Sequence, residues 1–258
     1  QGVSSAASDV YKRQVYNSGQ PLSDLSSFTT LVSWWKLDTG GSTITDSAGS
    51  NNGTNNGTAT QITSNVTSPS FNIPVNGVST TLPSTALQQS DLQFDSPYSN
   101  YSLSFDGSSY IDLSDLSNIG VSNASACSVS FWFKKNGDGN YVLFELKEGS
   151  SMIALQSNYS NKLYVYINNV SYNVAVTVAN NEWHNIMLVF DGTGTNSADR
   201  LKLYFNGSNI TGGTYSALVP TAVGTFTSSM TSNLGRTPTA AYFNGKMDAV
   251  SYTHLRAH

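Results

Sequence analysis

The chain has little charge and only one cysteine. Of its 258 residues, 11% are Asp, Glu, Lys or Arg, and Cys127 is the single cysteine. One cysteine excludes an internal disulfide framework and a cysteine-rich zinc site, and we expect Cys127 to be a small buried side chain at the start of a strand. No window approaches the ~20 consecutive apolar residues of a membrane-spanning helix. We therefore predict no membrane span.

Clusters of basic residues are also missing. The net charge is −4, and Lys and Arg are scattered along the chain. Nucleic-acid binding depends on basic side chains that neutralise phosphates, so we predict no nucleic-acid partner. Ser, Thr and Asn take the place of charge, while 38% hydrophobic and 11% aromatic residues are enough for a core. An uncharged polar surface is typical of extracellular and virion proteins, and we expect one of these locations.

The two ends of the chain differ from its interior. Residues 1–14 read QGVSSAASDVYKRQ and residues 251–258 read SYTHLRAH. Both resemble translated sequencing adapter of the kind found at the ends of metagenomic reading frames, so we expect them to be non-native tails. The alternative is a genuine polar tail at each end. On either interpretation, residues 31–250 are expected to form one domain.

From Leu31 onward, short apolar runs alternate with turns rich in Gly, Asn, Asp and Ser. No segment of 11 or more residues keeps the 3.6-residue apolar period of a helix. Short strands at regular spacing predict an all-β fold, a two-sheet antiparallel jelly-roll sandwich. The dipeptides Asp106-Gly107 and Asn206-Gly207 are favoured hairpin turns. The expected strands cover residues 31–37, 128–135, 140–146, 152–156, 163–167, 172–178, 184–190, 201–205 and 241–250, with two more in 101–113.

Six motifs follow one another along the chain: LVSWWKLD, YSLSFDGSSYIDL, SVSFWFKK, NEWHNIMLVFDG, LKLYFNG and GKMDAV. Their sequences and order resemble the laminin-G-like, concanavalin A-like jelly-roll family. Together they span residues 31–250. The resemblance implies a concanavalin A-like sandwich and a module that binds glycans or another surface ligand.

The segment before the domain extends the resemblance. Residues 15–27, VYNSGQPLSDLSS, resemble the segment that follows the closing strand in tandem arrays of these domains. Residues 15–30 would then be the tail of an upstream repeat, or else a linker. Tandem domains of this kind resemble those of bacteriophage fibres and bacterial adhesins, which implies neighbouring jelly-roll repeats as partners in the parent chain.

Catalytic residues are expected to be absent. Glycoside hydrolysis needs two carboxyl groups that flank the bond, and the glucanase relatives carry them as Glu-x-Asp-x-x-Glu on one strand. Here Glu145 and Glu148 are three residues apart, so they would face opposite ways on a strand, and no Asp lies between them. His184 lies beside Trp183 without a nucleophile-elbow sequence nearby. We predict that the chain is not an enzyme.

A calcium ion is the cofactor that the sequence allows. Calcium prefers six to eight oxygen ligands, and in the resembling family it often lies at an end of the sandwich. Asp38 follows the first strand and Asp248 lies in the last. If these strands are antiparallel neighbours, as the family implies, the two carboxylates converge. The alternative is that each aspartate caps a turn.

Alternation in LYVYI predicts a ligand-binding face. Leu163, Val165 and Ile167 share one side of the strand, and Tyr164 and Tyr166 share the other. We predict that Tyr164, Tyr166 and Tyr172, which follows the Asn168-Asn169 turn, contact a glycan or a protein. The alternative is cross-strand stacking of tyrosines. The competing functions are a ligand-free spacer or decoration domain of a virion, and an accessory module of a carbohydrate-active enzyme.

Overall fold

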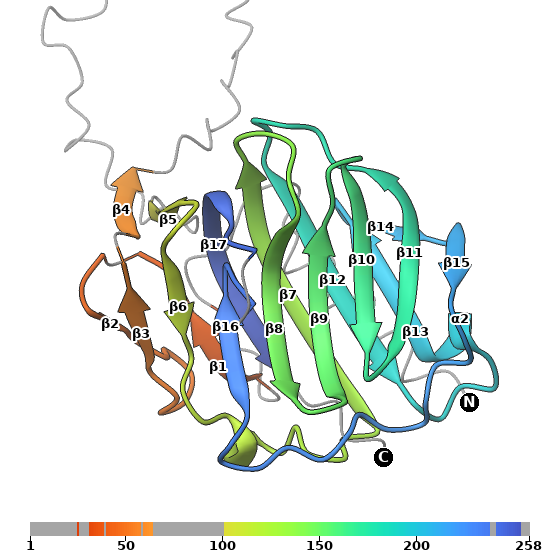
Figure 1. Ribbon diagram of the computed structural model, residues 1–258. Helices are drawn as coiled ribbons and strands as arrows, with labels where there is room; N and C mark the ends of the chain where they lie inside the picture. The colour runs from red at the N-terminus through yellow and green to blue at the C-terminus, as the bar shows by residue number, and fades with distance from the viewer. Residues whose placement is uncertain are drawn as a thin grey trace, which may run out of the picture.

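The computed structural model describes residue 25 and residues 31–38, 40–57, 59–63, 101–237 and 241–253. These residues form two antiparallel sheets that lie face to face, with the nine-stranded sheet in front of the eight-stranded sheet in Figure 1. The predicted all-β jelly-roll sandwich is confirmed. The segments 1–14 and 254–258 and all of 15–30 except Leu25 lie outside the described residues.

Strand order in the two sheets mixes distant parts of the chain. In the eight-stranded sheet it is β14 (Ser208–Ile210), β13 (Leu201–Phe205), β12 (His184–Asp191), β7 (Ala126–Lys135), β17 (Asn244–Thr253), β5 (Tyr101–Asp106) and β4 (Thr60–Thr63), with β1 (Leu31–Trp35) paired to β17. In the nine-stranded sheet it is β15 (Gly213–Tyr215), β11 (Val170–Thr177), β10 (Lys162–Ile167), β9 (Ser151–Ser157), β8 (Tyr141–Glu148), β16 (Thr231–Leu234), β6 (Tyr110–Asp112), β3 (Gly53–Asn56) and β2 (Thr43–Ile44).

Helix contributes little to the described part of the chain. A single 3-10 turn, η3, covers Ser117–Ile119, and a four-residue helix, α2, covers Ser197–Arg200. Among the described residues, no helix has the length and apolar character needed to cross a membrane.

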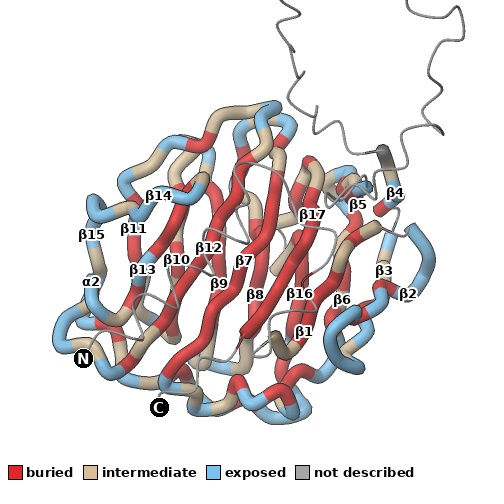
Figure 2. Tube along the Cα trace, turned by 180° about the vertical axis from the view of Figure 1, so that it is seen from behind, coloured by how far each residue is buried: buried red, intermediate tan, exposed pale blue. Residues whose placement is uncertain are grey.

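The core lies between the two sheets, as the buried inner strands of Figure 2 show. In β10, Leu163, Val165 and Ile167 are 0% exposed, because every second side chain of a strand points to the same face. Cys127, the second residue of β7, is also fully buried, as predicted. Burial raises the pKa of its thiol to about 12.

One of the two predicted hairpins is wrong. The residues on either side of Asp106-Gly107 form β5 and β6, but β5 pairs in the eight-stranded sheet and β6 in the nine-stranded sheet. The turn itself forms: an Asp106 carboxylate oxygen accepts hydrogen bonds from the amides of Ser108 (2.9 Å) and Ser109 (2.8 Å). The turn carries the chain from one sheet to the other instead of returning it alongside β5. The residues of the turn alone do not determine which of these two paths the chain takes.

The second hairpin is confirmed. Phe205 pairs with Ser208 across a two-residue turn between β13 and β14. Asn206 and Gly207 have φ values of 49° and 78°. A two-residue turn with positive φ at both positions is the type that matches the twist of paired strands, and Asn-Gly is its preferred sequence.

The first and last strands pair as expected. Trp35 of β1 lies opposite Val250 of antiparallel β17, and β17 also pairs with β5 and β7. β17 continues to Thr253, three residues into the 251–258 segment that we interpreted as adapter-derived. Tyr252 is only 1% exposed and belongs to the core. The alternation of Val250 and Tyr252 toward the core is what allows the strand to continue.

Candidate functional site

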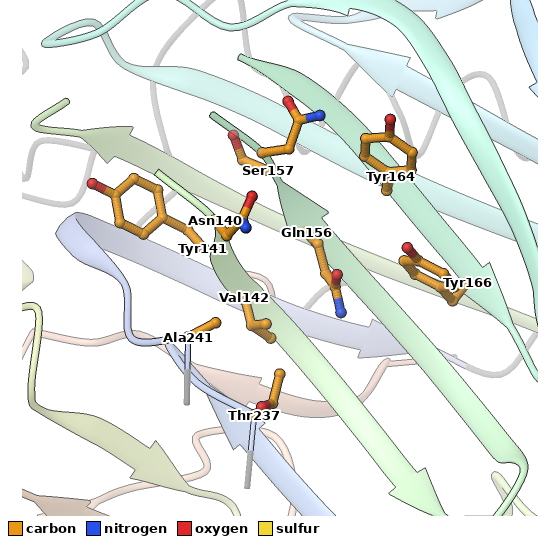
Figure 3. Close-up of a pocket in the computed structure, with 10 residues that line it drawn as sticks. Asn140, Tyr141, Val142, Gln156, Ser157, Tyr164, Tyr166, Thr237 and Ala241 are labelled. Carbon is orange, nitrogen blue, oxygen red and sulfur yellow. The ribbon is translucent and has the colours of Figure 1, made fainter. Parts of the chain in front are cut away.

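A pocket of about 360 Å³ lies on the outward face of the nine-stranded sheet, over β8, β9 and β10 (Figure 3). We call it the tyrosine pocket. It is lined by three tyrosines, three amide side chains and four smaller residues: Tyr141, Tyr164 and Tyr166; Asn140, Gln156 and Asn158; and Val142, Ser157, Thr237 and Ala241.

Strand register brings the central residues of the pocket together. Gln156 of β9 lies opposite Val142 of β8 and opposite Tyr164 of β10. Residues paired in this way point their side chains to the same face of a sheet. Because Leu163 and Val165 point into the core, this row points outward, with Tyr166 two residues further along the strand. The predicted outward face of Tyr164 and Tyr166 is confirmed.

Four of the polar side chains that line the pocket are available to a ligand. Among the described residues, the side chains of Asn140, Gln156, Tyr164 and Tyr166 make no hydrogen bond to the protein. Burial, and to a smaller extent the neighbouring Tyr164, raises the pKa of Tyr166. Its hydroxyl therefore stays protonated at neutral pH and can donate as well as accept.

Tyr141 closes the opposite end of the pocket. Its ring packs edge-on against Phe243, with 5.7 Å between ring centroids. Gly139 leaves room for it, since a Cβ atom on this glycine would lie 2.5 Å from a ring carbon of Tyr141. The Tyr141 hydroxyl donates to the Asp138 carbonyl at 3.4 Å. The pKa of Tyr141 is raised first by burial and then by the charge of Asp138.

Tyr172 does not join this surface, contrary to the sequence-based expectation. It pairs with Val165 across the hairpin, so its side chain points to the core face, and it is 2% exposed. Its ring stacks on Tyr215 with 4.2 Å between centroids and 8° between planes. Its hydroxyl donates to the Gly212 carbonyl at 2.7 Å. The two-residue turn at Asn168 sets a register that places Tyr172 opposite Val165 and not opposite Tyr166.

Sequence reasoning missed the amides of the pocket. Gln156 is the polar residue at the end of an apolar run, and the sequence indicates only that a strand ends there. Asn140 begins the expected strand 140–146, and Asn158 lies in the connection that follows the expected strand 152–156. Their role follows from which strands are neighbours, so no local signal marks them.

Of the two aspartates proposed for calcium, Asp248 lies in β17 and Asp38 follows the end of β1 by three residues. The Ala249 amide donates to the Lys36 carbonyl at 3.4 Å, which places Asp248 beside the end of β1. Asp248 is 0% exposed, and the carbonyl of Asp38 accepts a hydrogen bond from the Gln61 side chain. Within the described residues, no group of three or more His, Cys, Asp or Glu side chains is placed to hold a metal ion. Calcium at Asp38 and Asp248 stays a prediction.

Glu148 and His184, the other residues considered for catalysis, have structural roles. The carboxylate of Glu148 accepts from the amide and the hydroxyl of Thr227, at 2.5 and 2.6 Å. Nε2 of His184 lies 3.2 Å from the Ala179 carbonyl, and its ring stacks on Phe205 at 4.8 Å between centroids. Burial lowers the pKa of this histidine. His184 therefore holds neighbouring elements together, as expected from its strand position.

Glu145 stands apart from these groups. It lies on the outward face in the same cross-strand row as Asn233, and it is 1% exposed. Its Oε1 atom has no hydrogen-bond partner among the described residues. Burial raises its pKa, while the charges of Lys147 and Arg236 act in the opposite direction.

Comparisons with known proteins agree with this architecture. A laminin G family model, described as the concanavalin A-like lectin/glucanases superfamily, matches residues 105–253. No curated protein sequence matches the chain. Among solved structures, domain 4 of an extracellular arabinanase from Geobacillus stearothermophilus, in complex with arabinotriose, has a TM-score of 0.56 and 17% identity. That alignment covers 87% of this chain and 92% of the domain.

A second solved structure of similar fold belongs to a protein that is longer than this chain. The sialidase of Trypanosoma rangeli, in complex with sialic acid, has a TM-score of 0.56 and 11% identity. The alignment covers 99% of this chain and 37% of the sialidase. At these identities the likeness is one of fold.

Proposed function

This chain belongs to the concanavalin A-like lectin/glucanases superfamily, and we propose that it is a non-enzymatic module that binds glycans in the tyrosine pocket. The observation that carries the proposal is the make-up of the pocket. Tyr164 and Tyr166 offer aromatic rings beside Gln156 and Asn140, whose amides make no hydrogen bond within the described residues. A sugar presents both apolar C–H faces and hydroxyl groups, and this lining matches both.

The size of the pocket favours a short stretch of glycan over a protein surface. Small-ligand sites have volumes of about 300–1,000 Å³, and the tyrosine pocket has about 360 Å³. A stable protein partner needs a contact of about 800 Å² on each side. A concave site of this size suits one end or one short segment of an oligosaccharide.

The position of the acidic residues supports binding without hydrolysis. No Asp or Glu side chain is among the described residues that line the pocket. Glu145 is buried, and Glu148 is bound to the loop at Thr227. A glycosidase requires two carboxyl groups on either side of the scissile bond. Release of reducing sugar from a bound glycan would contradict this part of the proposal.

A glycan array tests the function, with arabinotriose as the first soluble probe because the arabinanase domain of similar fold was solved with that sugar. We expect the wild-type chain to bind, and the double variant Tyr164→Ala/Tyr166→Ala to bind at least about tenfold more weakly, a change of ~1.4 kcal/mol. Tyr101→Ala is the matched control, since Tyr101 is a 45% exposed tyrosine of the other sheet.

Calcium is tested in the same assay. If binding is lost in chelator and in Asp38→Asn, the calcium proposal is supported and a site at the Asp38 end of the sandwich is implicated. Binding that persists in chelator assigns recognition to the tyrosine pocket alone. A folded chain that binds no glycan in either condition would overturn the proposed function in favour of a ligand-free spacer.

We propose an extracellular or virion surface protein as the parent, with further jelly-roll repeats beside this domain. The uncharged, Ser-, Thr- and Asn-rich composition supports it. The sequence of the parent reading frame tests it. Repeated domains of the same kind would support a fibre or adhesin, and a neighbouring catalytic domain would instead indicate an accessory module of a carbohydrate-active enzyme.

A further inference from the structure

Lys135 is a buried lysine at one end of the sandwich. It is the last residue of β7 and follows Phe133 by two positions, so its side chain starts on the core face and is 0% exposed. A buried ammonium is costly unless it is hydrogen-bonded. Its Nζ atom donates to Oδ1 of Asn180 at 2.6 Å and to Oδ1 of Asn161, and lies 3.8 Å from a carboxylate oxygen of Asp138.

These three partners belong to three different connections. Asp138 lies in the turn between β7 and β8, Asn161 in the turn between β9 and β10, and Asn180 in the connection from β11 to β12. They are also joined to one another, since Nδ2 of Asn180 donates to Asp138 at 2.7 Å. The Asn181 amide donates to the Lys135 carbonyl at 2.8 Å. One ammonium therefore ties together connections that are distant in sequence.

Two of the three connections carry residues of the tyrosine pocket. Asn140 and Tyr141 directly follow the turn that contains Asp138, and Figure 3 shows both at one end of the pocket. Asn158 begins the turn that ends at Asn161. Loss of the Lys135 contacts would remove one anchor from each of these two turns, and with it support for one side of the pocket.

The turn at Asn158 is held by several hydrogen bonds and carries an exposed aromatic ring at its tip. The Asn158 carboxamide oxygen accepts from the amides of Ser160 and Lys162, both at 3.0 Å. Asn161, which has a φ of 59°, donates its amide to the Asn158 carbonyl at 2.9 Å. Tyr159 lies at the tip of this turn and is 68% exposed.

We propose that Lys135 is a positioning residue of the binding site, whose ammonium fixes the turns that carry Tyr141 and Asn158 and so presents Tyr159 at the rim. An alkyl side chain could fill this core position equally well. It could not bind three polar partners from separate connections, and the ammonium of Lys135 does. The effect on ligand binding rests on the proposed function, whereas the effect on the turns does not.

Two variants remove these contacts. Lys135→Met keeps an unbranched apolar side chain that reaches as far as the lysine Cε and removes the ammonium. Asn161→Gly removes one acceptor while retaining a residue that adopts positive φ without strain. It frees only the Asn158 turn, so it serves if Lys135→Met fails to fold. Glu148→Ala is the matched control, because it frees the Thr227 loop at the far end of β8.

Amide hydrogen exchange of the free chain and titration with arabinotriose provide the two measurements. We expect at least fivefold faster exchange in residues 136–141 and 157–161 for Lys135→Met, and in 157–161 for Asn161→Gly. We expect at least fivefold weaker binding for both variants. Glu148→Ala should lower the melting temperature and leave both properties unchanged.

The outcomes separate the two ideas. Unchanged exchange in both turns of a folded Lys135→Met or Asn161→Gly variant overturns the positioning role. Equal loss of binding in Glu148→Ala also overturns it, because the loss would then follow stability alone. If the wild type fails to bind arabinotriose, the proposed function loses that ligand, and the exchange measurement still decides the role of Lys135.

Discussion

Glu145 is a single side chain whose surroundings oppose its charge. It lies on the outward face of the sheet at 1% exposure, and its Oε1 atom and the Nδ2 atom of neighbouring Asn233 have no hydrogen-bond partner among the described residues. Burial raises its pKa. Compared with the unfolded chain, where Glu has a pKa of about 4.3, the folded protein holds this proton more tightly.

The sign of the pH effect follows from linkage. A raised folded pKa means that the unfolded state binds fewer protons, so stability falls as pH rises. The contribution of Glu145 is fully present below about pH 4.3 and is lost as pH rises through its folded pKa. We expect Glu145→Gln to remove this fall, measured as the free energy of unfolding in urea from pH 4 to pH 8. Glu182→Gln, at an exposed position, should keep it. A Glu145→Gln profile parallel to the wild type would contradict the assignment.

At the level of the elements, Asp46 organises the connection between β2 and β3. It is 4% exposed. One carboxylate oxygen accepts from the amides of Trp34 (2.8 Å), Ala48 (3.1 Å) and Gly49 (3.0 Å). The other accepts from the amide of Asn51 at 3.1 Å. Residues 46–54, DSAGSNNGT, therefore fold around one buried carboxylate that is also bound to the first strand.

We expect Asp46→Ala to destabilise the protein by about 3 kcal/mol, since hydrogen bonds to a charged group contribute roughly 1.5–3 kcal/mol and their donors would be left buried. Chemical denaturation measures the loss. Asp115→Ala is the control, because the Asp115 carboxylate accepts from the exposed Ser117 turn and its loss should cost less than about 1 kcal/mol. Equal effects in the two variants would show that the Asp46 network is not a special anchor.

Across the whole molecule, β17 is the strand on which the eight-stranded sheet depends. It pairs with β1, β5 and β7, which come from early and middle parts of the chain. Its last residues, 251–253, are buried in this arrangement. The tail that we interpreted as adapter-derived therefore begins inside a core strand.

Tyr252→Ala tests that contribution. Truncation of a large buried aromatic side chain costs about 3–5 kcal/mol, and Tyr252 is 1% exposed. We expect a loss in that range, read from thermal or chemical unfolding. Tyr159→Ala removes a side chain that is 68% exposed and should change stability by less than about 0.5 kcal/mol. A small effect at Tyr252 would indicate that the end of β17 adds little to the sheet.

By itself the sequence determined the all-β class, most strand positions and the outward face of Tyr164 and Tyr166. Each of these depends on the two-residue period of a strand, which neighbouring residues specify. It also identified the Asn206-Gly207 turn, because positive φ at both positions favours that dipeptide.

Only the tertiary structure decided which strands are neighbours and in what register. That choice separated β5 from β6, turned Tyr172 toward the core and placed Gln156 between Val142 and Tyr164. It also gathered the partners of Lys135 from three connections. Pairing depends on contacts between residues far apart in the chain, where burial of the complete sandwich outweighs local preference.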